Sequence, residues 1–333
     1  MSVERLLILR LSALGDVAMT IPVIYSLAEQ HPDVEITFVT RPFFARLLIN
    51  APANLRVFAA DLKGRHRGAR GLLRLMHELS ALRPTAVADL HNLPRTWVID
   101  TWFRMRGIKV RMVDKARSKR KKALRNKTEQ KPFTERYRDV LGELGYDVRL
   151  TFKSLYEHVP AQPPVDPGSR AVGIASFARY ANKTYPPEMM RQVAAALAAE
   201  GIDVYLFGGG GKEAEVLSGW EKDSPRIHCV AGTFAIEQEL ALMNRLRLMV
   251  SMDSANQHLA SIAGTRVVSI WGSTTPECGF MPYGQSRENA VCHRIECQPC
   301  SVAGTPQCPL GHMKCLREIN PKEIVDKVLS NIS

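Results

Sequence analysis

Short apolar runs alternate with amphipathic stretches along most of the chain of 333 residues. In the first half, these runs indicate buried strands, and a helical pattern follows most of them. The predicted strands are residues 6–11, 35–40, 55–60, 85–90 and 108–113, and the first helix is predicted at 20–30. Strand–helix alternation of this kind predicts a parallel sheet with helices on both faces.

The pattern breaks at residues 157–170, where four prolines lie within eight residues. Proline fixes φ and lacks an N–H donor, so this stretch is predicted to be a linker. The alternation then restarts, with strands predicted at 171–177, 203–208, 226–232, 247–252 and 266–271. The length also fits about two domains.

The predicted fold class is therefore α/β, with two doubly wound parallel-sheet domains and a ligand cleft between them. Ligands of such sheets bind at the carboxyl ends of the strands. The predicted boundaries are 1–156 for the N-terminal domain, 157–169 for the linker, 170–318 for the C-terminal domain and 319–333 for a final helix.

Composition narrows the class of protein. With 45% apolar and 23% charged residues, the chain is typical of globular proteins, which excludes disorder, collagen-like repeats and small disulfide scaffolds. No apolar stretch approaches the ~18 residues that a membrane-spanning helix needs. The apolar run at the start of the chain is too short for a signal peptide, and charged residues interrupt it. We therefore expect a cytoplasmic protein.

The loop after the first predicted strand combines small residues with one carboxylate. Ser12, Ala13 and Gly15 let a ligand approach the backbone, and the helix that follows favours an anion at its N-terminus. No G-x-G-x-x-G dinucleotide motif is present. Asp16 is either a cap of that helix or a catalytic base.

Two later loops also follow predicted strands. The first contains Gly208 and Gly209 but is not a P-loop, because Glu213 follows the lysine; it is a backbone nest for phosphate or ribose, or a flexible turn. The second places Asp253, Ser254 and Asn256 at a helix start with His258 one turn later. This arrangement predicts a phosphate cradle, or else a well-capped helix with a solvent-facing histidine.

Three motifs together resemble the bacterial lipopolysaccharide heptosyltransferases, which form glycosyltransferase family nine. They are RLSALGDVAMTIPV near the start, the lysine of ANKTYPPE, and MDSANQHLASIAGTRVVSIWGSTTP, and they occur in the family's order. The resemblance implies the GT-B fold, in which two Rossmann-like domains face each other across a cleft. In that family the C-terminal helix often returns to the N-terminal domain.

The resemblance also implies an activity: inverting transfer of a heptose from ADP-heptose to the growing lipopolysaccharide core, with no metal required. By motif position, Asp16 would be the general base for the acceptor hydroxyl. Lys183 would meet the donor diphosphate and neutralise charge on the leaving ADP. The donor-binding candidates are Ser12, Gly15, Lys183, Gly208, Gly209, Asp253, Ser254, Ala255, Asn256 and His258.

The chain departs from the family pattern in two motifs. Ala255 stands where the family usually has glycine, and because alanine does not tolerate positive φ we expect a slightly different loop. His91 and Asn92 replace the last two residues of an Asp-x-Gln-Gly pattern on the acceptor side. His91 is thus an acceptor contact or an ordinary strand-end side chain. Arg95, in the same segment, is a further acceptor-binding candidate.

Positive charge is concentrated in one segment. From residue 111 to 131 there are ten basic and two acidic residues, a net +8 of the chain's +12. Residues 115–127 contain no aromatic side chain on which a single-stranded base could stack, so no nucleic acid is expected. The segment suits an anionic lipid-linked saccharide or the anionic inner leaflet of the inner membrane, or is a solvated face. Its acceptor-binding candidates are Arg117, Arg120 and Lys122.

Five of the seven cysteines lie between residues 292 and 315. Cys297 and Cys300 form a C-x-x-C pair, and Cys308 and Cys315 are two further thiols, a pattern that suggests structural zinc. The C-x6-C spacing of the second pair is not that of a zinc ribbon, so free thiols or a disulfide remain the alternative. No cofactor is expected for catalysis itself.

Two other classes of function remain open at this stage. One is a GT-B enzyme that uses another nucleotide sugar, as a transferase or an epimerase. The other is a basic binding protein whose domains perform no chemistry. Asp16, Lys183 and Asp253 on predicted domain edges favour an enzyme.

Overall fold

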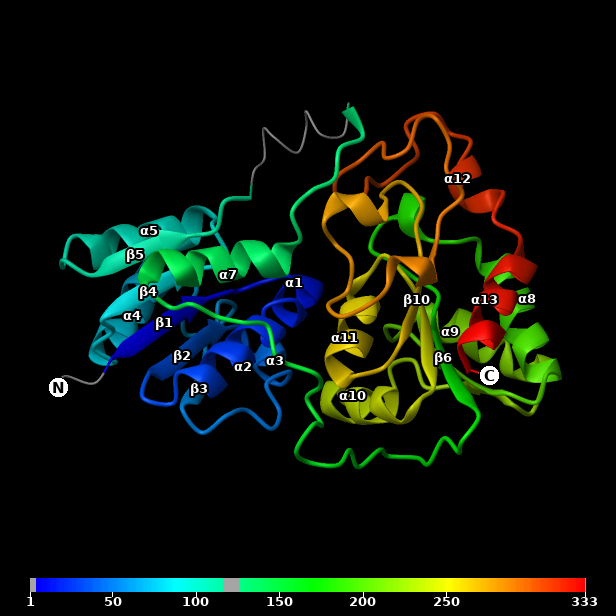
Figure 1. Ribbon diagram of the computed structural model, residues 1–333, viewed down its shortest axis with the longest axis horizontal. Coiled ribbons are helices and arrows are strands. Elements are labelled where there is room, and N and C mark those ends of the chain that lie inside the picture. Colours follow the sequence, from blue (N-terminus) through cyan, green and yellow to red (C-terminus); the bar gives the residue numbers. More distant parts are fainter. Residues whose placement is uncertain (1–3, 116–125, 333) are drawn as a thin grey trace. The chain divides into compact units, whose positions relative to one another are not determined.

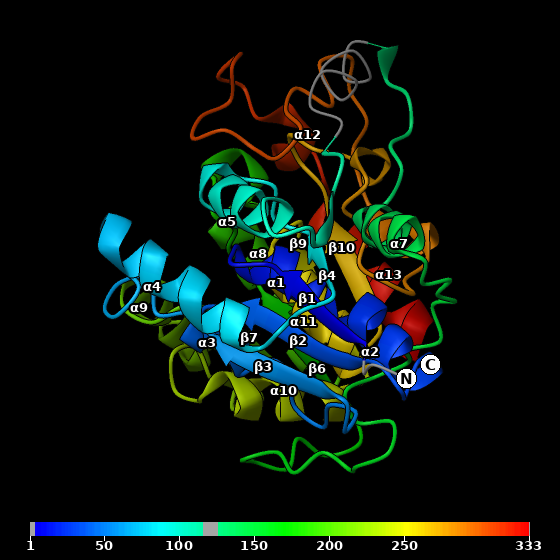
Figure 2. The ribbon, with the colours of Figure 1, turned by 90° about the vertical axis from the view of Figure 1, so that its left-hand side faces the viewer.

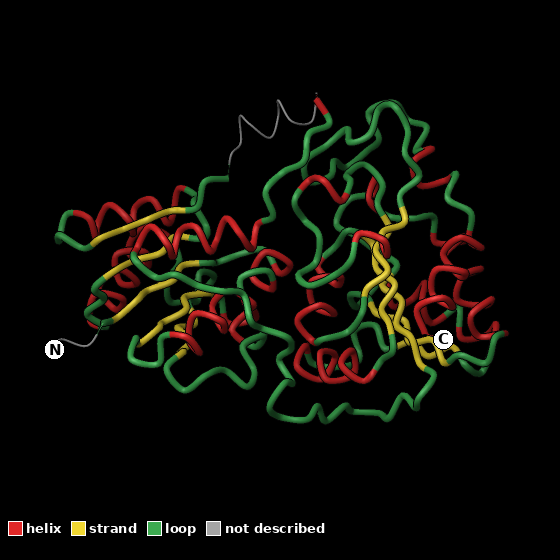
Figure 3. Tube along the Cα trace, viewed as in Figure 1, coloured by secondary structure: helices red, strands yellow, loops and turns green. Residues whose placement is uncertain are grey.

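The computed structural model describes residues 4–115 and 126–332, and the chain forms two compact units (Figures 1 and 3). Unit 1 comprises residues 1–116 and 131–155, and unit 2 comprises 117–130 and 156–333. In both units the strands run parallel and helices fill the crossovers, as the alternation of patterns predicts.

Unit 1 has one sheet of five strands in the order β3-β2-β1-β4-β5. Each predicted strand of this half is present, as β1 (Arg5–Leu9), β2 (Glu35–Thr40), β3 (Leu55–Ala59), β4 (Ala86–Asp89) and β5 (Lys109–Met112). The helices are α1 (Leu14–Ala18), α2 (Ile21–Gln30), α3 (Pro42–Ala45), α4 (Gly68–Ala81), α5 (Pro94–Arg104) and α7 (Phe133–Leu144). Leu7, Leu9 and Val87 of the central strands pack with Leu75 of α4 and Phe103 of α5 in one core.

Unit 2 has a sheet of six strands in the order β11-β10-β9-β6-β7-β8. The predicted strands are β6 (Ala171–Ala175), β7 (Asp203–Phe207), β8 (Ile227–Cys229), β9 (Leu248–Met252) and β10 (Val267–Ile270). The unpredicted β11 (Ala290–Val291) has two residues, too few to show a period in sequence. The helices are α8 (Pro187–Ala199), α9 (Lys212–Ser218), α10 (Ile236–Arg245), α11 (Ala255–Ala263), α12 (Lys314–Arg317) and α13 (Pro321–Ile332).

Each sheet has one point where the strand order reverses. In unit 1 this switch point lies between β1 and β4, and in unit 2 it lies between β6 and β9. Connections leave a switch point in opposite directions, so the loops at the carboxyl ends of these strands leave a crevice for a ligand. The loops after β1, β4, β6 and β9 carry most of the residues that the sequence singled out.

The boundary between the units differs from the predicted one. Residues 126–130, within the connection from β5 to α7, belong to unit 2 rather than to the N-terminal domain. The backbone N–H of Gln130 donates to the backbone carbonyl of Glu277 at 2.8 Å, and Glu129 forms an ion pair with Arg287. Residues 157–169, the predicted linker, contain neither helix nor strand.

The final helix packs within unit 2. Ile324, Val325 and Val328 of α13 are buried in the core of this unit, where the helix packs against α8. Its apolar stripe is thus buried within its own unit. No helix within the described ranges is long and apolar enough to cross a bilayer.

Two carboxyl groups are buried together beneath the β4 end of the unit 1 sheet. Asp89 and Asp100 are both fully buried. Burial, together with the charge of Asp89 and a hydrogen bond to it, raises the pKa of Asp100 to about 8. Asp100 is therefore protonated at neutral pH and can donate to the Asp89 carboxylate.

This pair makes stability pH-dependent in a defined direction. Between its ordinary pKa near 4 and its folded value of about 8, Asp100 binds a proton in the folded chain only, so the free energy of unfolding falls as pH rises through this window. Asp100→Asn, whose amide still donates to Asp89, should flatten the dependence of the urea midpoint on pH. Exposed Asp33→Asn is the control and should keep the wild-type slope. Equal slopes in all three proteins would contradict the protonated pair.

Candidate active site

The loop after β1 positions Asp16 through a buried arginine. A nitrogen of the Arg10 guanidinium lies 2.7 Å from an Asp16 carboxylate oxygen; the Arg10 side chain is 3% exposed and that of Asp16 is 31% exposed. Burial disfavours the charged form of Arg10 and by itself would lower its pKa. Electrostatic interactions with Tyr137 and Asp16 act in the other direction and are stronger, so the pKa of Arg10 is raised. The carboxylate is therefore held by a permanent cation on one side while it remains open to solvent.

Asp16 does not occupy the N-cap that was the alternative to catalysis. Ala13 is the N-cap of α1, and Asp16 is the third helical residue, whose carboxylate accepts the Ala13 N–H at 3.1 Å. The side chain thus caps the helix start from inside the first turn. This bond fixes the carboxylate and does not exclude a second role.

The loop after β4 brings His91 to the same switch point. An Asp89 carboxylate oxygen accepts the N–H groups of His91 at 2.7 Å and Asn92 at 2.9 Å, which tightens the turn. The His91 ring is buried and is hydrogen-bonded to the backbone of Ser12. Burial first, and then Arg10 among nearby cations, lowers the pKa of His91 to about 3, so the imidazole is neutral.

Asn92 and Arg95, also predicted to bind the acceptor, are placed differently. The Asn92 amide nitrogen donates to the Val113 carbonyl at 2.6 Å, and its oxygen accepts from the Trp97 indole at 2.7 Å. Its side chain is thus used to hold the loop. Arg95 is half-buried in the first turn of α5. The structure therefore brings Ser12, Asp16 and His91 together, with Gly15 beside Asp16.

Unit 2 contains a second anchored carboxylate, at its own switch point. The Lys183 ammonium lies 2.7 Å from an Asp253 carboxylate oxygen, with side-chain exposures of 13% and 4%. Asp253 also accepts from the Thr274 hydroxyl at 2.5 Å and from the Gln257 amide at 3.0 Å. Lys183 follows β6 and Asp253 follows β9, so the fold joins residues 70 positions apart in sequence.

The helix that begins after Asp253 has an ordinary backbone at its start. Ser254 is the extended N-cap and Ala255 the first residue of α11. Ala255 is not among the described residues with positive φ, so alanine fits this position and the expected distortion of the loop is not seen. Asn256 is half-exposed in the first turn, whereas His258 is 5% exposed and lies in the protein interior, not toward solvent. The first-turn N–H groups of α11 are available to an anion.

The glycine loop after β7 already holds a carboxylate. A Glu213 carboxylate oxygen accepts the Gly209 N–H at 2.7 Å and lies over Gly208. A phosphate at this position would have to displace or approach Glu213, so the geometry suits a hydroxyl better than a phosphate. The two glycines as donor contacts remain a prediction.

Two further loops complete this site, and their pairing was not predicted. The Gly304 backbone packs against the aliphatic part of Lys183, where an added Cβ would lie 2.6 Å from Lys183 Cδ. The carbonyl of Ser273, beside Thr274, accepts the N–H groups of Cys300 and Ser301. Residues 272–275 and 298–304 therefore form one wall that supports both Lys183 and Asp253. No spacing in the sequence signals this pairing.

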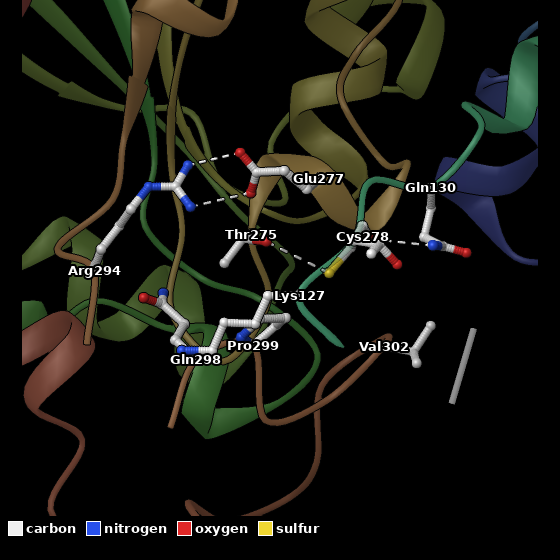
Figure 4. A pocket seen from close by; sticks show the side chains of 10 residues that line it. Lys127, Gln130, Thr275, Glu277, Cys278, Arg294, Gln298, Pro299 and Val302 are labelled. Carbon is white, nitrogen blue, oxygen red and sulfur yellow. Dashed lines mark hydrogen bonds and ion pairs between the residues drawn. The ribbon is translucent and has the colours of Figure 1, made fainter. Parts of the chain in front are cut away.

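The other side of that wall borders a pocket of about 250 Å³. Arg294 and Glu277 form an ion pair at one side, and the Gln298 side chain is 5% exposed with its carbonyl oxygen unpartnered within the described residues (Figure 4). Residues 126–130 close the pocket from the opposite side. The lining residues are Lys127, Thr128, Gln130, Thr275, Glu277, Cys278, Arg294, Gln298, Pro299 and Val302.

The C-terminal cysteines do not form the predicted ligand set. No disulfide joins any of the seven cysteines, and among the residues described no group of three or more His, Cys, Asp or Glu is arranged to hold a metal ion. Cys297 lies 3.9 Å from the His312 ring and Cys300 3.7 Å from the Ser273 carbonyl. Structural zinc on Cys297, Cys300, Cys308 and Cys315 stays a prediction without support from this geometry.

Arg117, Arg120 and Lys122, the acceptor-binding candidates of the basic run, lie outside the described residues.

Known proteins resemble the chain over most of its length. The model of glycosyltransferase family 9 (heptosyltransferase) matches residues 73–310. Lipopolysaccharide heptosyltransferase 3 of Escherichia coli is 24% identical over 279 residues, which are 78% of this chain and 81% of that protein.

Solved structures share the fold. A glycosyl transferase family 9 protein from Veillonella parvula superposes with a TM-score of 0.73 at 20% identity and covers 100% of this chain and 98% of its own. The structure of the E. coli heptosyltransferase WaaC with ADP superposes with a TM-score of 0.70 at 19% identity. The match covers 98% of this chain and 99% of the WaaC chain. The structure of WaaC with ADP-2-deoxy-2-fluoro heptose superposes with a TM-score of 0.67 at 18% identity. The match covers 99% of this chain and 100% of the WaaC chain. At these identities the likeness shows the two-unit GT-B fold.

The buried Lys183–Asp253 pair should be sensitive to loss of one partner. Lys183→Met leaves a buried carboxylate without its cation and should lower the free energy of unfolding by about 3 kcal/mol. Adding Asp253→Asn should recover much of that loss. The control is Arg191→Met, which removes an exposed, solvent-screened pair with Asp223 and should cost much less. Urea unfolding measures all of them, and equal losses for Lys183→Met and Arg191→Met would contradict the assignment.

Proposed function

Because the chain belongs to glycosyltransferase family 9, the heptosyltransferases of lipopolysaccharide biosynthesis, we propose that it transfers a heptose from ADP-heptose to the inner core of lipopolysaccharide with inversion at the anomeric carbon. The observation that carries this proposal is the pairing of Lys183 with Asp253 at the switch point of unit 2. A lysine cation and the free N–H groups of a helix start lie together there, an arrangement suited to a diphosphate.

The donor is proposed to bind unit 2. The WaaC structures contain ADP or an ADP-heptose analogue, which supports the same nucleotide here. Lys183 would neutralise the charge that develops on the leaving diphosphate, and the α11 amides would bind a phosphate oxygen. Asp253 holds the lysine in place through their ion pair, so it acts as a positioning residue for the cation.

The proposed base is Asp16. Its carboxylate accepts the proton of the acceptor hydroxyl while that oxygen bonds to the anomeric carbon. The bond from this carbon to the diphosphate oxygen breaks at the same time, and ADP leaves with the electron pair from the opposite face. Arg10 and the Ala13 N–H fix the carboxylate, so little reorientation is needed when the substrate arrives.

The acceptor is proposed to be an anionic, lipid-linked saccharide at the cytoplasmic face of the inner membrane. Neutral His91 is suited to hydrogen bonding with a sugar hydroxyl, because its pKa of about 3 keeps it uncharged in the working range. The charge of the acceptor would be met by Arg95 and by the basic run. A different nucleotide sugar remains the alternative, and binding of ADP, UDP and GDP compared by thermal shift separates the two.

The role of Asp16 predicts a separation of turnover from donor binding. Asp16→Asn keeps the shape of the side chain but removes the proton acceptor, so kcat should fall by at least ~10²-fold. The dissociation constant of ADP should not change, because the donor is proposed to bind unit 2. Glu29→Gln, an exposed change on α2, is the control. Turnover like that of the wild type in Asp16→Asn would exclude Asp16 as the base.

The transfer should not require a divalent metal. Lys183 and the helix start can supply the positive charge that a bound ion would otherwise provide. Initial rates with and without EDTA should therefore agree. A loss of activity that Mg²⁺ restores would show that these groups do not neutralise the leaving diphosphate on their own.

A further inference from the structure

Helices α4 and α5 of unit 1 lie side by side (Figures 1 and 2). Their side chains line an exposed apolar groove. The groove has a volume of about 340 Å³. Its large apolar side chains, which we call the α4–α5 patch, are Met76, Trp97, Val98, Trp102 and Met105. Trp97 is 43% exposed, Val98 47% and Met105 72%. Contiguous apolar exposure of this kind marks an interaction site.

The aromatic side chains of the patch are held in fixed positions. The Trp97 indole donates to Asn92 Oδ1 at 2.7 Å, and the Trp102 indole donates to the Ser80 hydroxyl at 2.9 Å. The Arg106 guanidinium stacks on the Trp102 ring at 3.4 Å. A partner would therefore meet a preformed surface, which lowers the entropy cost of binding.

The charge around the patch has one sign. Residues 67–106 contain seven arginines, against one glutamate and two aspartates. Both aspartates are fully buried, and the glutamate, Glu78, is paired with Arg65 and His66. Arg70, Arg74, Arg104 and Arg106 are all exposed on or beside the two helices. The partner should thus be anionic as well as apolar.

We propose that the α4–α5 patch docks on an anionic lipid bilayer. Tryptophan favours the boundary between headgroups and acyl chains, and exposed arginines attract anionic headgroups. The exposure of Val98 and Met105 argues against a nucleic acid as the partner, because an aliphatic side chain neither binds phosphates nor stacks on bases. Among acyl chains such a side chain is stabilised. None of the patch residues belongs to the basic run at 115–127.

The patch adjoins the proposed acceptor loop. Asn92 directly follows His91 and accepts the hydrogen bond from Trp97. A bilayer bound at the patch would present lipid-linked saccharides next to the carboxyl edge of the unit 1 sheet. The presentation of acceptor saccharides rests on the proposed function. The docking itself does not, because it needs neither donor nor acceptor.

The test is cosedimentation of the full chain with vesicles, without any substrate. Vesicles of equal parts phosphatidylglycerol and phosphatidylcholine should bind the protein, and vesicles of phosphatidylcholine alone should bind it at least ~10-fold more weakly. Trp97→Glu with Met105→Glu should lower binding to the anionic vesicles at least ~10-fold. Leu310→Glu, an equally exposed apolar position in unit 2, is the matched control and should bind like the wild type.

Two further measurements keep the result specific to this surface. Arg70→Gln with Arg74→Gln should weaken binding and reduce its dependence on salt, because both are exposed cations on α4, one of the two helices that carry the patch. Tryptophan emission should shift to the blue on anionic vesicles in the wild type and should shift less in Trp97→Phe, which keeps an apolar ring but leaves Trp102 as the only indole of the patch. Circular dichroism confirms that each variant is folded.

Several outcomes would overturn the proposal: no binding to anionic vesicles, equal binding to both vesicle types, or wild-type binding by the folded patch variant. A chain that binds vesicles but transfers no heptose would contradict the proposed function and leave the docking surface standing. A chain that transfers heptose to a soluble acceptor but does not bind vesicles would contradict the docking surface and leave the proposed function standing.

Discussion

Parallel pairing of the strands is the constraint on which both units depend. A parallel strand can follow its neighbour only after a crossover, so each connection runs as a helix or loop over one face of the sheet. Where the crossovers change face, between β1 and β4 and between β6 and β9, the carboxyl ends of two central strands are left open. Asp16 and His91 lie at the first opening, and Lys183 and Asp253 at the second.

The two anchored carboxylates illustrate how burial assigns different tasks to one chemical group. Asp16 has one buried cation behind it and keeps about a third of its side chain in solvent, so it can reach a substrate proton. Asp253 is almost completely enclosed, with a lysine, a hydroxyl and an amide as partners. A carboxylate enclosed in this way is suited to fixing its partners, because each of its oxygens is already used.

Local hydrogen bonds connect the catalytic edge of unit 1 to its outer surface. Asp89 holds the turn that carries His91 and Asn92, and it is itself supported by protonated Asp100. Asn92 in turn holds Trp97 at the exposed groove. A buried acid pair, the proposed acceptor loop and the proposed docking surface thus belong to one continuous network, in which a change at one member would be felt at the next.

Much of the fold is determined by the sequence alone. All ten predicted strands are present, and the linker lacks regular structure, because apolar period and proline act locally along the chain. Three motifs were enough to indicate the family and, with it, Lys183, while Asp16 and Asp253 could be selected because they follow strand ends. These features depend on residues that are neighbours in sequence.

The tertiary structure decided what depends on residues far apart. Neither the contact of Lys183 with Gly304 nor the support of Ser273 by residues 300 and 301 has a local signal. The same holds for the attachment of residues 126–130 to unit 2 and for the packing of α13 on α8, where an amphipathic stripe shows that a face is buried but not against what. Burial also gave His91 its neutral ring, because desolvation depends on the surrounding side chains and not on the residue itself.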